Sequence, residues 1–242
     1  LKLAAERYSD AVLLSATRAI SDERRDAITA EAERLVPGVS DAPAWETLLG
    51  NLALRDLDER DALEDLRSAV AARELDSARD LAAVLDWRLD PETERSGGPL
   101  PWLPALPSRL SSDAQHGAWL HERRELVVTC REDLNAIVAG WDDETVPEWA
   151  RDIYVGHARF AGDLLAWRSA HDVPDDDTSV AGPAHPHARE RRYQRKLEER
   201  YERLAGGTTR HGAAFLETLK TSAPEVLNDV WWPVLAQRLD LA

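Results

Sequence analysis

Few residues in this 242-residue chain have the types and spacing that chemistry requires. The nearest approach to a phosphate-binding loop is Gly207-Thr-Thr-Arg-His-Gly212, which has the gap between glycines that a P-loop requires. Ala213 and Ala214 follow it, where a P-loop has a lysine and a hydroxyl to reach phosphate and magnesium. A predicted helix, not a strand, precedes it. The segment lacks the groups that hold a nucleotide, and we expect no cofactor.

Two histidines, His185 and His187, flank a proline and follow the acidic run 175–177, a spacing that resembles that of metal ligands. A metal site also needs neighbouring groups that orient each imidazole, and a proline-containing loop offers few. His116 and His121 are five residues apart and so do not share a helix face. No catalytic motif with a nucleophile and its base is found. We therefore expect no metal site, and we expect that the chain is not an enzyme.

The segment 189–203 is the one local basic feature, with seven Arg or Lys residues against four Glu. In one interpretation it contacts single-stranded DNA or a partner, with arginines on phosphates and a tyrosine stacked on a base. In the other it is a surface helix with charge pairs such as Arg195 with Glu199, which the interleaved glutamates favour. The candidate contact residues are Arg189, Arg191, Arg192, Tyr193, Arg195 and Lys196.

The composition is that of a helical, globular chain, with 43% hydrophobic and 31% charged residues. Its net charge of −15 repels nucleic-acid phosphates, so any DNA contact would have to be local. No apolar run is long enough for a membrane span, and the single cysteine, Cys130, cannot form an internal disulfide. We expect a cytoplasmic location without membrane contact. Because the chain has no methionine and starts inside a helical pattern, we expect it to be part of a longer protein.

The elements that must position these residues are predicted to be helices. Trp45, Leu48, Leu49 and Leu52 recur at helical spacing, and 63–89 reads as a helical hairpin with Asp76 capping its second helix. Nothing alternates with period two, so strands are not expected. The predicted fold is all-α, an irregular multi-helix bundle in two packed subdomains, 1–90 and 113–242.

Residues 91–112 join these subdomains, and their density of prolines and glycines excludes a regular helix. We interpret this connector as a clasp of extended backbone with Trp102 as its structural anchor. Further on, the sequence predicts an acidic mobile loop at 172–187, a charged helix over 188–204 ending at the next two glycines, and two short helices around Phe215 and Val234.

Two long helices are expected between the connector and the acidic loop. The first has an apolar stripe that we interpret as core, with the thiol of Cys130 as inert packing: Trp119, Leu126, Cys130, Leu134, Ile137 and Trp141. The second begins at Pro147, with Gly156 allowing a close helix crossing, and its apolar face consists of Trp149, Ile153, Phe160, Leu164 and Trp167.

The segment ARELDSARDLAAVLDWRLDPETERSGGPLPWLPALPSRL, at 72–110, resembles the carboxy-terminal helical region of actinobacterial conjugative relaxase-helicases of the TrwC/TraI type, the MobF family. LVPGVSDAPAWETL, AWRSAHDVP and RYQRKLEERY resemble further segments of that region. The family's nickase has a tyrosine nucleophile and a histidine-bound metal, and its motor has a P-loop; none of these is carried over to this chain. The resemblance implies a non-catalytic region that follows the helicase core.

Three functions follow as hypotheses. The first is an accessory, protein-interaction region that contacts relaxosome components, the coupling protein of the secretion channel or other domains of its own chain. The second is a module that guides single-stranded DNA along the 189–203 helix. The third is a free-standing helical-repeat adaptor.

Overall fold

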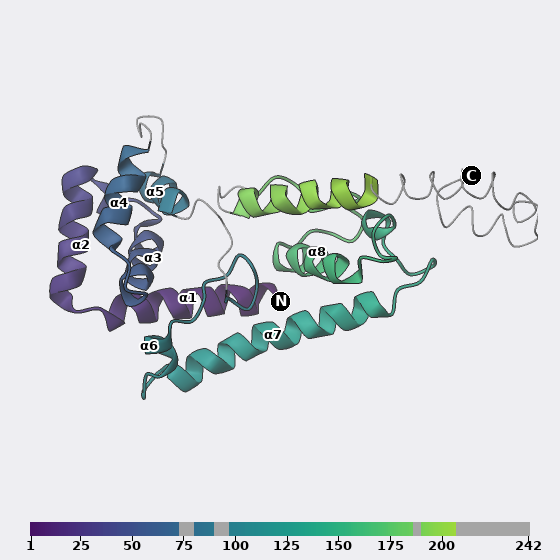
Figure 1. Cartoon of the computed structure of the whole chain (residues 1–242), viewed down its shortest axis with the longest axis horizontal. Helices are drawn as coiled ribbons and strands as arrows, with labels where there is room; N and C mark the ends of the chain where they lie inside the picture. The colour runs from purple at the N-terminus through teal and green to yellow at the C-terminus, as the bar shows by residue number, and fades with distance from the viewer. Residues whose placement is uncertain (73–79, 90–96, 186–189, 207–242) are drawn as a thin grey trace, which may run out of the picture. The chain divides into compact units, whose positions relative to one another are not determined.

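The computed structural model of the chain describes residues 1–72, 80–89, 97–185 and 190–206 (Figure 1). Within these ranges it contains nine α-helices and no strand, which confirms the all-α prediction. None of the described helices combines the length and the apolar surface that a bilayer span needs. The helices are α1 (Lys2–Ala19), α2 (Asp22–Leu35), α3 (Trp45–Leu57), α4 (Ala62–Ala71), α5 (Leu81–Leu89), α6 (Ser108–Ser111), α7 (Gly117–Ala139), α8 (Ala158–Ala170) and a ninth over 190–206, with two short 3-10 turns, η1 (Val39–Asp41) and η2 (Glu148–Ala150).

The chain divides into two compact units. The first consists of Leu1–Glu132 with Ala184–Gln194, and the second of Asp133–Pro183 with Arg195–Ala242. The described part of the connector lies in the first unit, together with most of α7 and residues 184–194. The Tyr8 hydroxyl of α1, for example, donates a buried hydrogen bond of 2.8 Å to the Pro104 carbonyl. The subdomains expected at 1–90 and 113–242 stay a prediction.

Helix α3 is the centre of the first unit, where it packs against α1, α2, α4 and α5. The face expected to be apolar, from Trp45 to Leu52, is buried, and so is most of the rest of the helix. Gly50 lets α3 approach α1 closely, since an added Cβ would lie 2.9 Å from the Cβ of Leu13. Because α3 packs against four helices, its buried apolar residues are not confined to one stripe.

Several helices begin at residues with capping side chains. Ser21 caps α2 and Asp61 caps α4, each accepting a hydrogen bond from the amide three residues later. The Asp80 carboxylate does the same just before α5. The expected hairpin of α4 and α5 is present, but the expected cap, Asp76, lies outside the described residues.

The second unit corrects the prediction of one long helix from Pro147. The chain instead makes the turn η2, several further turns, and then α8 from Ala158. Gly156 is in the left-handed region, with φ of +86°, which interrupts the helix; an added Cβ there would touch nothing within 4 Å, so the residue does not serve a helix crossing. The five apolar residues of the expected face are nevertheless all buried.

The expected core stripe of α7 is also wrong. Leu120, Val127 and Val138 are the buried apolar residues of this helix. Trp119, Leu126 and Ile137 of the expected stripe are exposed, and the other three members are half-buried. The buried face is rotated about the helix axis from the expected one by about one residue, or 100°. The two faces were confused because both carry apolar residues.

Candidate functional site

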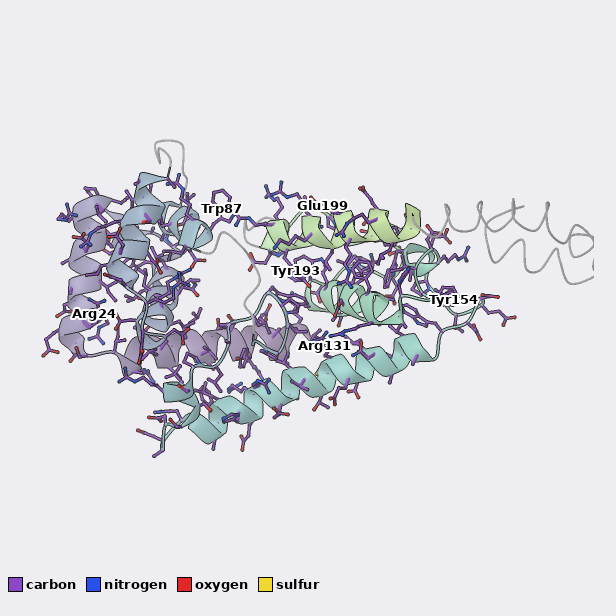
Figure 2. All side chains as sticks on the ribbon, in the orientation of Figure 1. Arg24, Trp87, Arg131, Tyr154, Tyr193 and Glu199 are labelled. Carbon is purple, nitrogen blue, oxygen red and sulfur yellow. The ribbon has the colours of Figure 1, made fainter. Side chains whose placement is uncertain are left out.

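The described candidates for DNA or partner contact lie on the 190–206 helix, and most of them already have structural partners. The Arg191 Nε donates a 2.7 Å hydrogen bond to the carbonyl of His185. The Arg192 guanidinium lies 4.8 Å from the ring centre of Trp87, which comes from α5 (Figure 2). A cation over an indole face is held by the ring quadrupole, so Arg192 contributes to packing.

Tyr193, the aromatic candidate, is only 6% exposed. Its ring centre lies 5.2 Å from that of Trp102, in a tilted arrangement. A ring packed in this way does not offer a free face to a nucleobase, which stacking on single-stranded DNA requires. Of the remaining candidates, Arg195 is exposed, Lys196 is half-buried and Arg189 lies outside the described residues.

Tyr201 is held within the second unit by Asp152. Its hydroxyl donates a 3.2 Å hydrogen bond to the Asp152 carboxylate. Burial, and then the negative charge of Asp152, raises the pKa of Tyr201 to about 12. The phenol stays protonated at neutral pH, so the Tyr201 hydroxyl has the state of a hydrogen-bond donor rather than of a nucleophile.

The histidine pair is only partly described. The backbone amide of His185 donates a 2.9 Å hydrogen bond to the Gln194 side chain, while His187 lies outside the described residues. Over the described ranges, no three side chains of the His, Cys, Asp and Glu types come together as a metal site would need. The P-loop-like segment 207–212 and the helices expected around Phe215 and Val234 also lie outside these ranges.

The acidic loop after α8 is organised by Arg168, which is 2% exposed. Its guanidinium lies 4.8 Å from the ring centre of Trp149. Burial lowers the pKa of Arg168, and the charges of Asp177 and Asp175 oppose that change. The same guanidinium donates hydrogen bonds to the carbonyl oxygens of Pro174, Asp177, Ser179 and Val180. These bonds fix the described part of the loop; the expected mobility of 172–187 stays a prediction.

The connector anchor, Trp102, is 9% exposed and packs against Tyr193. This burial is what a packing anchor requires. Its contribution to stability stays a prediction.

One exposed surface on the first unit has the composition of a contact site. Trp119 and Leu126 lie seven residues apart on α7, and they are 38% and 51% exposed. The Arg123 guanidinium lies over the Trp119 ring, 4.4 Å from its centre. We call these three residues, together with the other exposed positions of residues 118–132, the α7 face. Tryptophan and arginine are enriched where proteins bind each other.

The sequence contains a second apolar stripe on this helix, but periodicity alone does not show which of the two stripes is exposed. Leu120 and Val127 repeat the seven-residue spacing of Trp119 and Leu126, one position further along the chain. Two adjacent apolar stripes on one long helix are more than a single packing contact needs. This excess could have indicated a second, exposed contact.

The chain matches no family model, no curated protein and no solved structure.

Proposed function

We propose that this chain is a non-catalytic protein-interaction region of a conjugative relaxase-helicase. It acts in plasmid DNA transfer by binding relaxosome components, the coupling protein or other domains of its own chain. The observation that carries the proposal is the α7 face, where Trp119 and Leu126 are exposed side by side along one helix. Large apolar side chains in a row, with an arginine beside them, are what a protein partner buries.

The family assignment rests on the segments that resemble such proteins. In the described residues those segments contribute buried side chains rather than chemical groups, for example Val39 in η1, Trp45 at the start of α3 and Trp167 on α8. A region that follows a motor domain and binds partners needs a stable scaffold and an exposed contact surface. Both the resemblance and the exposed α7 face support a region of that kind.

In the architecture that we propose, the connector acts as a clasp within the first unit. Support comes from the two neighbours of the Pro-rich segment, α1 and the 190–206 helix. Tyr8 of α1 bonds to Pro104, and Tyr193 of the later helix packs on Trp102. One short segment therefore contacts a helix that precedes it in the sequence and a helix that follows it.

The test uses the purified chain and a mating assay. We expect the chain to bind a relaxosome accessory protein or the cytoplasmic part of a coupling protein in calorimetry, and we expect Trp119→Ala with Leu126→Ser to remove that binding. The same two substitutions in the parent protein should lower transfer frequency without lowering nicking or ATPase activity. The proposal fails if no component binds and if deletion of the region leaves transfer intact.

A further inference from the structure

The α7 face has acidic side chains next to its apolar ones. Glu122 is exposed and lies three residues after Trp119 and four before Leu126, so it adjoins both. Glu125 and Glu132 are exposed as well and lie one heptad apart on the outer side of the same helix. The exposed surface of residues 118–132 is therefore an apolar stripe with a row of carboxylates beside it.

Arg123 lies over the Trp119 ring, whereas the other two arginines of α7 lie toward its packed face. Arg124 follows the buried Leu120 by four residues, and Arg131 follows the buried Val127 by four. Residues four apart share a helix face, and both arginines are half-buried. Arg124 also pairs with Glu125 at 2.9 Å. Arg123 lies over Trp119, and Arg124 and Glu125 form an ion pair with each other, while Glu122 and Glu132 face outward.

Trp119 is positioned before any partner binds. The Arg123 guanidinium covers one side of its ring, and the buried Arg123 Nε has no hydrogen-bond acceptor among the described residues, so the indole face is its neighbour. A side chain that is already ordered loses less conformational freedom on binding than a mobile one. A pre-positioned tryptophan is suited to be the central contact of a docking site.

The charges distinguish between the occupants of such a face. A second copy of the chain would bring another net charge of −15 and the same carboxylates, which repel. A helix with an apolar stripe and lysines or arginines beside it would bury Trp119 and Leu126 and place its cations against Glu122 and Glu132. Complementary charge also speeds the encounter of the two partners.

We propose that the α7 face binds a cationic amphipathic helix of another protein. This inference rests on the proposed function, because it names the chemistry of the partner that the protein-interaction region would bind. The apolar stripe supplies the buried contact, and the carboxylate row selects the charge of the partner.

The probe is a fluorescent, helix-forming peptide about three heptads long, with leucines on one face and lysines beside them. Binding to the full chain is followed by anisotropy. Two peptides of the same length serve as comparisons: one with the same residues scrambled so that no apolar face forms, and one with glutamates in place of the lysines. The scrambled peptide is essential, because a chain of charge −15 attracts any cation.

The expected result is that the amphipathic cationic peptide binds at least about tenfold more tightly than either comparison. Raising the salt concentration from about 0.1 M to about 1 M should weaken binding of the amphipathic cationic peptide, because the screening length falls from about 10 Å to about 3 Å. Leu126→Ser should lose about tenfold in affinity. Leu14→Ser on α1 is the matched control, since Leu14 and Leu126 are both 51% exposed.

The carboxylates are tested separately. Glu122→Gln with Glu132→Gln should weaken binding of the cationic peptide and leave the affinity of the glutamate peptide equal or higher. Glu6→Gln with Glu46→Gln, two exposed glutamates on other helices, should change neither. Equal binding of the scrambled peptide, or equal effects of the two glutamine pairs, would overturn the proposal. So would self-association of the chain, seen in sedimentation, that Leu126→Ser removes.

Failure of this inference is distinguishable from failure of the proposed function. If a relaxosome or coupling protein binds through Trp119 and Leu126 but the cationic peptide does not, the function stands and the inference falls. If the peptide binds as expected but no transfer component does, the surface chemistry stands and the conjugative function falls.

Discussion

At the scale of single residues, the connector is anchored by one ring. Trp102→Ala should destabilise the chain by about 3 kcal/mol or more, because it removes a large buried side chain and leaves a cavity beside Tyr193. Unfolding in urea, followed by circular dichroism, measures the change. Trp119→Ala is the matched control: its ring is exposed, and we expect a loss of about 1 kcal/mol or less. Equal losses for the two variants would mean that Trp102 is not an anchor.

Glu31 is the residue whose ionisation ties α2 to α4. Hydrogen bonds from Arg34, and then from Arg67, lower its pKa from 4.5 to about 2. Because the folded-state pKa is lowered, this carboxylate contributes stability above its ordinary pKa of 4.5, and that contribution disappears as the pH falls toward about 2.

The prediction concerns the difference between wild type and Glu31→Gln. Thermal unfolding measured from pH 6 down to pH 2 should show a lower Tm for the variant than for the wild type at pH 6. This difference in Tm, the gap, should decrease as the pH falls. Glu64→Gln is the comparison, because Glu64 contacts the same Arg67 only at 3.4 Å and is largely exposed. A gap for Glu31→Gln that stayed constant down to pH 2 would contradict the lowered pKa.

At the scale of elements, Arg168 organises the loop after α8 through a planar set of donors that reach four backbone carbonyls. Lysine keeps the charge but lacks the planar fork, so Arg168→Lys leaves some of these four carbonyls without their donor. We expect a loss of about 2 kcal/mol or more in urea unfolding and faster hydrogen exchange at the Asp177 amide. Arg159→Lys, an exposed change on the same helix, should do neither. Unchanged exchange at Asp177 in Arg168→Lys would show that the loop is ordered without it.

The buried residues of α3 were predictable from sequence, because this helix packs against four others and every position of its expected apolar pattern is buried. Trp45 and Leu48 follow the pattern of α3, and both are buried. The apolar spacing gave the wrong buried face where two faces of one helix have the same spacing of apolar residues. On α7 the exposed Trp119 and the buried Leu120 are adjacent, and only the packing of other elements determines which of them faces inward.

The candidate site was less predictable than the fold, for the same physical reason. Spacing placed Tyr193 on a basic helix but could not show that Trp102, far away in the sequence, would cover its ring. Gly156 lay within a helical pattern, and its positive φ becomes visible only in the folded chain. Exposure depends on contacts between distant segments, and periodicity along one helix does not report those.

At the scale of the whole molecule, the acidic charge separates protein binding from DNA binding. The net charge is −15, and two of the exposed cations that single-stranded DNA could meet on the 190–206 helix are Arg191 and Arg195. Phosphate contacts supply most non-specific affinity, and with few of them the affinity depends little on salt. We therefore expect weak binding of an oligothymidine at about 50 mM salt that changes little at about 200 mM salt, measured by anisotropy.

The variant that discriminates is Arg191→Glu with Arg195→Glu, compared with Arg7→Glu and Arg18→Glu, an exposed pair on α1. Both pairs lower the net charge equally, so a general charge effect changes DNA binding by the same amount in each. If the first pair alone abolished a tight, steeply salt-dependent affinity, the 190–206 helix would be a DNA-guiding element, and the protein-interaction proposal would give way to it. Equal and small effects, together with peptide binding lost in Leu126→Ser, would place the contact surface of this chain on α7.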